Sequence, residues 1–149
     1  MGQVTATSRA TIAAPADLTY RLIADVAQRP KFAPVAFSGF EVVAGRVGAG
    51  AVHKFDFQAP SRPPRSYVME VTEPEPGRVL VETDRNSSLV TRFTVTPQGQ
   101  GCEVAITTTW KGAGGIGGFF EKTFAPKALR GIYADELARL DAYARTQPT

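Results

Sequence analysis

The sequence contains a single histidine, His53, and the residues around it indicate where chemistry could take place. His53 alternates with Phe55 and Phe57 along a predicted strand, so its imidazole points to the same side as two aromatic rings. A buried neutral imidazole can act as a base or as a hydrogen-bond donor. Because no serine or cysteine nucleophile is arranged around it, we expect a structural or ligand-contacting histidine first and a catalytic histidine second.

Tyr67, Met69 and Arg65 form a second group, because they share one face of the strand that follows a proline-rich turn at 60–64. The Tyr67 hydroxyl can donate a hydrogen bond to a buried ligand oxygen, and Arg65 can pair with a carboxylate or an enolate. If the protein is an enzyme, we expect its catalytic residues to be His53, Tyr67 and Arg65.

Aromatic residues at strand spacing belong more often to a core than to a pocket, but in an incompletely filled fold the same face can serve both purposes. The residues that we expect to contact a ligand are Phe55, Phe57, Met69, Phe93, Thr108, Trp110, Phe120 and Phe124. For Trp110, at the end of the last predicted strand, packing against the terminal helix is the favoured role. Phe120 and Phe124 open that helix and are predicted to line or close the cavity.

Three other patterns resemble functional motifs, and a structural role is favoured for each. The glycines at 112–117 have the G-x-G-x-x-G spacing of dinucleotide-binding loops, but no parallel second strand follows, so we predict a flexible loop that can act as a lid. The single cysteine, Cys102, alternates with apolar residues and is predicted to be small and buried. Glu70, Glu73 and Glu75 are predicted to lie on a solvated edge.

Composition excludes several classes of protein. The 149 residues are 43% hydrophobic and 21% charged, which is typical of one globular domain spanning 1–149. The net charge of +3 is dispersed and forms no basic stripe, so nucleic acid is not an expected partner. No apolar run approaches the about 18 residues of a membrane span, and no signal peptide is recognisable. We expect a cytoplasmic monomer or homodimer without metal or cofactor, since one histidine and one cysteine cannot build the common zinc sites.

The spacing of apolar residues predicts a mixed architecture. A strand is expected at 4–12, then a helix from 15 to 25 and a second short turn at 26–29 that Pro30 stops. From 37 to 110 apolar and polar residues alternate in six segments separated by tight turns, which is typical of sequential antiparallel hairpins.

The C-terminal segment supplies the cover for the apolar face of this sheet. Between 119 and 145 an apolar stripe recurs at helical spacing, formed by Leu129, Tyr133, Leu137, Leu140 and Ala144. A helix that lies obliquely across a curled sheet leaves space between the two, so the pattern predicts a cavity lined by the inward residues. The expected fold class is α+β: a curved antiparallel sheet of about seven strands around a long C-terminal helix, with two short helices after the first strand.

This order of elements resembles the START/Bet v 1-like superfamily and its helix-grip fold, in particular the bacterial polyketide cyclase/dehydrase-like branch. The resemblance covers residues 4 to 145 and rests on the segments AAPAD at 13–17, LIAD at 22–25, FEVVAG at 40–45, GAG at 48–50 and ELARL at 136–140. These motifs are structural, so they speak to the fold more than to the function. Where the branch often carries a tryptophan after the second short helix, this chain has Phe32.

Two functions from different classes follow from the sequence. The first is a binding module, a carrier or sensor that holds an aromatic, polyketide-like or lipid-like molecule in its cavity. The second, which the resemblance implies, is a polyketide cyclase/dehydratase-type enzyme that acts on a ligand in the same cavity. A third hypothesis, a protein that binds a partner or client, rests on analogy alone.

Overall fold

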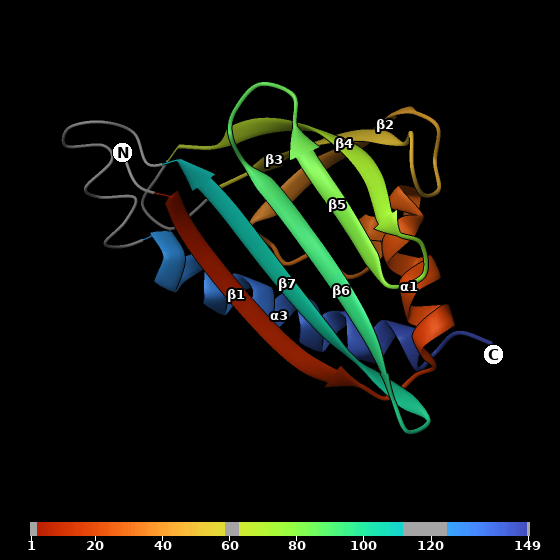
Figure 1. The fold of residues 1–149 in the computed structure, drawn as a ribbon. Helices are drawn as coiled ribbons and strands as arrows, with labels where there is room; N and C mark the ends of the chain where they lie inside the picture. The colour runs from red at the N-terminus through yellow and green to blue at the C-terminus, as the bar shows by residue number, and fades with distance from the viewer. Residues whose placement is uncertain (1–2, 59–62, 112–124, 149) are drawn as a thin grey trace.

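The computed structural model describes residues 3–58, 63–111 and 125–148, and in this part of the chain one sheet curves around one long helix (Figure 1). The elements in chain order are β1 (Gln3–Ile12), α1 (Ala16–Ala24), the 3-10 helix η1 (Val26–Lys31), β2 (Phe37–Ala44), β3 (Val52–Phe57), β4 (Arg65–Glu75), β5 (Val79–Asp84), β6 (Val90–Gln98), β7 (Gly101–Lys111) and α3 (Ala125–Ala144). The predicted seven strands, two short helices and C-terminal helix are therefore confirmed.

The strands pair in the order β1-β7-β6-β5-β4-β3-β2, and every pairing is antiparallel. Among the described strands, only the β1–β7 pairing joins strands that are distant in the chain, because α1, η1 and the other strands lie between them. The register brings Phe55 opposite Tyr67, and Glu82 opposite Thr91. Side chains of neighbouring strands therefore meet on the concave face, where the ligand residues were predicted.

The inward residues follow the predicted alternation. On β4, Tyr67, Met69 and Val71 are buried, while Glu70 between them is exposed. The stripe of α3 is buried against the concave face, with Leu137 and Leu140 at 0% and 1% exposure. This burial of apolar area is the main force that holds the helix in the sheet. The core that results includes Ile12, Leu18, Ile23, Phe32, Leu80, Val95, Cys102, Val104 and Ile106.

Hydrogen bonds fix α3 along β1 and against η1. The Ser8 hydroxyl donates to the carbonyl oxygen of Arg130 at 2.8 Å, and the Ala13 amide donates to the Asp141 carboxylate at 2.7 Å. At the other side of the helix, the Tyr143 hydroxyl donates to Gln28 at 2.6 Å. Because apolar contacts are not directional, these polar contacts define how far along the sheet the helix sits.

Glu73 differs from its predicted place on a solvated edge. Its carboxylate accepts a hydrogen bond from the Tyr20 hydroxyl at 2.7 Å and another from the Ala49 amide at 2.8 Å. Glu70 and Glu75 are exposed, as predicted. Glu73 therefore joins α1 to the turn before β3, a contact that strand alternation does not reveal because its partners come from other elements.

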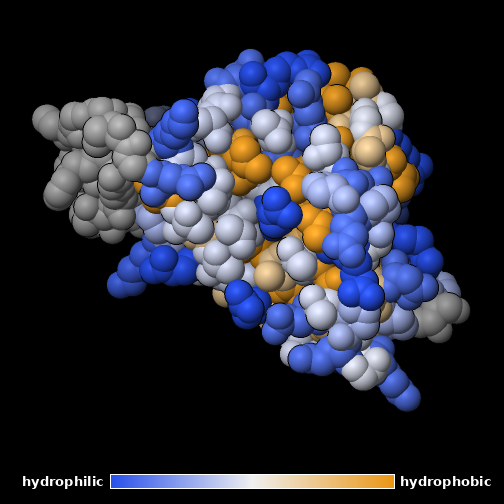
Figure 2. All heavy atoms as spheres, viewed as in Figure 1, coloured by the Kyte–Doolittle hydropathy of each residue, from blue (hydrophilic) through white to orange (hydrophobic). Residues whose placement is uncertain are grey.

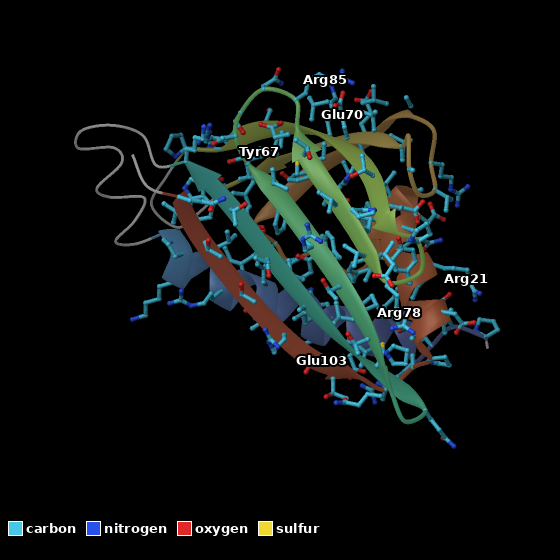
Figure 3. The ribbon with its side chains drawn as sticks, viewed as in Figure 1. Arg21, Tyr67, Glu70, Arg78, Arg85 and Glu103 are labelled. Carbon is cyan, nitrogen blue, oxygen red and sulfur yellow. The ribbon has the colours of Figure 1, made fainter. Side chains whose placement is uncertain are left out.

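The convex face of the sheet is turned away from α3. Figure 2 shows hydrophilic side chains spread over this face, with smaller hydrophobic areas among them. Glu70 and Arg85 form an exposed ion pair there at 2.8 Å (Figure 3). Within the described residues, no helix has the length and apolar character needed to cross a membrane.

Candidate functional site

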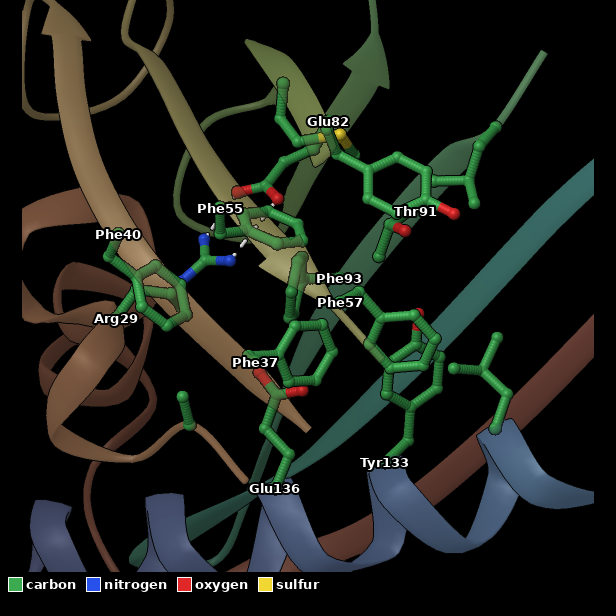
Figure 4. A pocket seen from close by; sticks show the side chains of 15 residues that line it. Arg29, Phe37, Phe40, Phe55, Phe57, Glu82, Thr91, Phe93, Tyr133 and Glu136 are labelled. Carbon is green, nitrogen blue, oxygen red and sulfur yellow. Dashed lines mark hydrogen bonds and ion pairs between the residues drawn. The ribbon is translucent and has the colours of Figure 1, made fainter. Parts of the chain in front are cut away.

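A cavity of about 70 Å³ lies between the concave face of the sheet and α3 (Figure 4). Its walls come from the five strands β2 to β6, from η1 and from α3, so it forms only when these elements are assembled. The described residues that line it are Arg29, Ala33, Phe37, Phe40, Phe55, Phe57, Tyr67, Met69, Glu82, Leu89, Thr91, Phe93, Leu129, Tyr133 and Glu136.

Aromatic rings from β2, β3 and β4 make one continuous wall of this cavity. The Phe37 ring lies 4.9 Å from the Phe57 ring and 5.5 Å from the Phe55 ring, measured between centroids. Phe55 in turn lies 5.5 Å from Phe40 and 5.9 Å from Tyr67. These separations and the tilted arrangement are typical of favourable ring pairs. The wall is therefore packed within itself and presents its remaining surface to the cavity.

A buried ion pair between Arg29 of η1 and Glu82 of β5 forms part of the cavity wall. The Arg29 guanidinium donates two hydrogen bonds to Glu82, at 2.5 Å and 3.3 Å, and a third to the carbonyl oxygen of Ile23 at 2.9 Å. The Arg29 guanidinium carbon also lies 4.8 Å from the centre of the Phe93 ring. On the other side of the carboxylate, Nε2 of His53 is 3.2 Å from Glu82. Burial alone would raise the pKa of Glu82, but the charges and hydrogen bonds of Arg29 and His53 lower it to about 2.

A chain of hydroxyl groups crosses from the sheet to α3. Thr91 and Thr108, which face each other on β6 and β7, share a hydrogen bond at 2.7 Å, and Thr108 is hydrogen-bonded to the Tyr133 hydroxyl. Burial raises the pKa of Tyr133 well above its ordinary value, so this phenol stays protonated. The chain satisfies three buried hydroxyls and fixes the helix next to the cavity.

Glu136 is the polar lining residue without such a partner. Its side chain points from α3 into the cavity, and the residue is 6% exposed. Within residues 3–58, 63–111 and 125–148 no hydrogen bond reaches its carboxyl group. Burial raises the pKa of Glu136 to about 7, with Arg29 opposing the rise and Glu82 and Asp135 adding to it. The cavity thus contains a carboxyl group that can gain or lose a proton near neutral pH.

The structure brings part of the predicted site together. Phe55, Phe57, Tyr67, Met69 and Phe93 all line the cavity. They do so because alternate residues of neighbouring strands point to the same face of the sheet. Their contact with a ligand remains a prediction.

Other predicted residues lie beside the cavity or away from it. His53 is buried and reaches the cavity through Glu82, while Thr108 reaches it through Thr91 and Tyr133. Trp110 is half-buried and packs against the core. Arg65 shares the face of Tyr67, as expected, but it begins β4 and is exposed, with its guanidinium carbon 5.6 Å from the centre of the Tyr67 ring.

The remaining predictions fall on residues that the structure does not describe. Phe120 and Phe124 lie outside the described residues, and so does the glycine segment 112–118 for which a lid was predicted.

Sequence reasoning missed three charged lining residues, Arg29, Glu82 and Glu136. For Glu82 a signal existed, because it shares a strand face with the buried Leu80. For Glu136 a signal also existed, because residues three apart share one face of a helix and Glu136 follows the stripe residue Tyr133 at this spacing. The spacing therefore places the charged side chain of Glu136 on the inward face of α3. Arg29 has no such local signal, since η1 is too short to show a period.

The fold and the cavity define the class of protein. A curved antiparallel sheet that grips a long C-terminal helix, with two short helices after the first strand, is the helix-grip fold of Bet v 1-like proteins. Residues 3–145 match the family described as polyketide cyclase / dehydrase and lipid transport, and the chain belongs to this family. The helix-grip fold and the family predicted from the sequence are therefore confirmed.

Solved structures agree with this assignment. The chain is 40% identical to the KanY protein, whose solution structure superposes with a TM-score of 0.86 over 97% of this chain and 99% of that one. Norcoclaurine synthase from Thalictrum flavum, solved in complex with dopamine and hydroxybenzaldehyde, is 16% identical with a TM-score of 0.72, over 99% of this chain and 90% of that one. The major latex-like protein 151 from Panax ginseng is 11% identical with a TM-score of 0.70, over 95% and 97%. The latter two show the fold alone, and no curated protein sequence matches the chain.

Proposed function

We propose that this protein binds a small, largely hydrophobic ligand with an aromatic ring inside the cavity, as a carrier or a sensor. The observation that carries the proposal is the wall of aromatic rings that surrounds residual space in the fold. Interior packing is normally dense, and a cavity left open among apolar side chains lowers the stability of the folded state. A ligand with an apolar ring would restore the missing contacts.

The size of the cavity limits what enters without rearrangement. About 70 Å³ is well below the roughly 300–1,000 Å³ of pockets that hold drug-sized molecules. A single ring with a short substituent is therefore the kind of ligand that we propose for this state of the protein. A polyketide-length or lipid-length chain requires the walls to move apart.

Ala33 offers a direct test, because it lines the cavity and its small side chain can be enlarged. We expect Ala33→Phe to place a ring in the ligand's space and to abolish binding. Val35, two residues further on, is 93% exposed, so Val35→Phe is the matched control and should bind normally. Native mass spectrometry of the purified protein, with released molecules identified, and calorimetry with benzyl alcohol measure both variants. If the wild type retains no ligand and binds neither benzyl alcohol nor a panel of hydrophobic dyes, the proposal is wrong.

An enzymatic function of the cyclase/dehydratase type is the second candidate, and Glu136 is the observation that favours it. A general base works best when its pKa lies near the operating pH, and the pKa of Glu136 is about 7. Proton abstraction next to a carbonyl group of a bound ligand is chemistry that such a carboxylate can perform. In this proposal the charge of Arg29 favours the ionised form of Glu136, which is the form that accepts the proton. His53, Tyr67 and Arg65 remain predicted catalytic residues that the same assay can test.

The chemical fate of the bound ligand distinguishes the carrier from the enzyme. In the carrier, Glu136→Gln leaves the bound molecule chemically unchanged, as the wild type does. In the enzyme, the wild type converts the ligand and Glu136→Gln retains it unconverted, because glutamine cannot accept the proton. Mass spectrometry of the ligand before and after incubation distinguishes these results. A Glu136→Gln variant that converts the ligand at the wild-type rate excludes Glu136 as the base.

A further inference from the structure

The sign of the net charge differs between the described cavity lining, which is negative when its acids are ionised, and the whole protein, which is positive. The chain carries a net charge of +3, yet the described lining contains one cation, Arg29, and two acids, Glu82 and Glu136. Arg29 and Glu82 neutralise each other through two hydrogen bonds. The charge left over in the lining is therefore the charge of Glu136.

Most polar groups of the lining already have other partners, and the buried Nε of Arg29 makes no hydrogen bond within the described residues. Both terminal nitrogens of Arg29 are engaged with Glu82 and Ile23, and the Tyr133 hydroxyl is engaged with Thr108. In the part of the chain that the structure describes, no donor makes a hydrogen bond to the Glu136 carboxylate. A buried carboxylate needs donors to replace water, and a bound ligand is the group that can supply them.

The rest of the wall suits a positive group. Aromatic faces attract cations because the quadrupole of the neutral ring makes its two faces partially negative, and rings gathered around one position are a common way to bind an ammonium group. Here Phe37, Phe40, Phe55 and Phe57 lie across the cavity from the helix that carries Glu136 (Figure 4). The cavity thus combines ring faces with one carboxylate that no described donor satisfies.

We propose that the ligand of this cavity carries a protonated amine, and that Glu136 is its counter-ion. This inference rests on the proposed ligand-binding function and adds the chemical class of the ligand: a small aromatic ring bearing an ammonium group. The ammonium donates to the Glu136 carboxylate while the ring packs against the aromatic wall. Neutral rings of the same size fill the same space but leave the carboxylate without a donor.

The protonation of Glu136 couples to such binding. The charged groups that act on its carboxyl are Arg29 on η1, Glu82 on β5 and Asp135 on α3 itself. Because the pKa of Glu136 is about 7 in the free protein, an ammonium ligand must displace a proton at acid pH. An aliphatic amine keeps its own proton across this range, as the lysine side chain does. Affinity for the amine should therefore fall about tenfold from pH 8 to pH 6.

Benzylamine and benzyl alcohol make a matched pair of probes, since they have the same ring and the same number of heavy atoms. We expect calorimetry on the wild type at pH 8 to give an affinity for benzylamine at least tenfold above that for benzyl alcohol. In Glu136→Gln the ratio should fall to about one. Asp135→Asn is the control on the same helix, because Asp135 is exposed and paired with Arg139 at 2.9 Å, and this variant should retain the preference.

Each other outcome overturns a defined part of the proposal. If the wild type binds benzyl alcohol as tightly as benzylamine, ligand binding stands and the amine inference is wrong. If Glu136→Gln keeps the preference for benzylamine, Glu136 is not the counter-ion. If the wild type binds neither probe, the amine inference is wrong, and the proposed function fails with it when the protein also retains no ligand and binds no hydrophobic dye. The pH dependence of the wild type gives a readout that does not require any variant to fold, and a flat profile between pH 6 and pH 8 contradicts the coupling.

Discussion

Arg29 holds the buried carboxylate of Glu82, and replacing Arg29 with methionine tests how much this ion pair contributes to folding. The two residues are 5% and 2% exposed. Methionine removes the charge and three hydrogen bonds, so the carboxylate keeps His53 as its remaining partner among the described residues. Loss of one partner from a buried ion pair costs about 3–5 kcal/mol, because the other charge stays buried without compensation.

The pKa of Glu82 leads to a similar magnitude. A value of about 2 in place of the ordinary 4.5, at 1.36 kcal/mol for each pKa unit, corresponds to about 3 kcal/mol of stabilisation at neutral pH. In a domain of about 150 residues, each kcal/mol changes Tm by about 2–4 °C. We therefore expect Arg29→Met to lower Tm at pH 7 by about 6–20 °C.

Thermal unfolding by calorimetry measures this effect, with two companion variants. Arg21→Met is the control, because Arg21 is an exposed arginine on α1 whose ion pair with Asp17 contributes little. Arg29→Met combined with Glu82→Met should recover most of the loss, since an apolar pair of similar volume carries no desolvation cost.

Because the pKa of Glu82 is lowered on folding, the contribution of Glu82 to stability is full above pH 4.5 and is lost as the pH falls through about 2. The deficit of Arg29→Met should shrink below about pH 4. A Tm for Arg29→Met within about 2 °C of the wild type at pH 7 refutes this reasoning.

Three further predictions concern the wall formed by α3 and the turns of the sheet. Tyr133→Phe removes one hydroxyl from the hydrogen-bonded chain of Tyr133, Thr108 and Thr91. It should lower the free energy of unfolding by only about 1 kcal/mol, because the two threonines still pair with each other. An unchanged midpoint in chemical denaturation contradicts a structural role for these hydrogen bonds. The pKa of Glu136 is raised to about 7 in the folded state, so its contribution to stability is full below about pH 4.5 and is lost as the pH rises through 7. The Tm of the wild type should therefore fall from pH 5 to pH 8, whereas the Tm of Glu136→Gln should change less. Parallel Tm profiles of the two proteins contradict this prediction. Gly131→Ala should raise stability by about 1 kcal/mol, because this helical glycine has open space around it. Gly101→Ala should lower stability, because a Cβ there would lie 2.5 Å from the Ile12 carbonyl oxygen. Denaturant midpoints of the two variants that move in the same direction refute the comparison.

Much of the fold and part of the site could be predicted from local periods in the sequence. Alternation along a strand determines which side chains share a face, and for this reason Phe55, Phe57, Tyr67 and Met69 were correctly placed on the concave side. The same holds for the stripe of α3, where Leu137 and Leu140 are buried. These patterns depend only on neighbours in the chain, so no knowledge of the tertiary structure is required.

The polar part of the site depends on contacts that no local pattern contains. Arg29 and Glu82 are 53 residues apart, and they meet only because η1 docks against the middle of the sheet. The same docking places Glu136, which is 6% exposed, within reach of the Arg29 charge. The sequence by itself thus determined the sheet, the helix and the apolar wall, because the period of apolar residues follows from backbone geometry. Only the tertiary structure decided which charges share the cavity, because burial and pairing depend on which distant segments pack together.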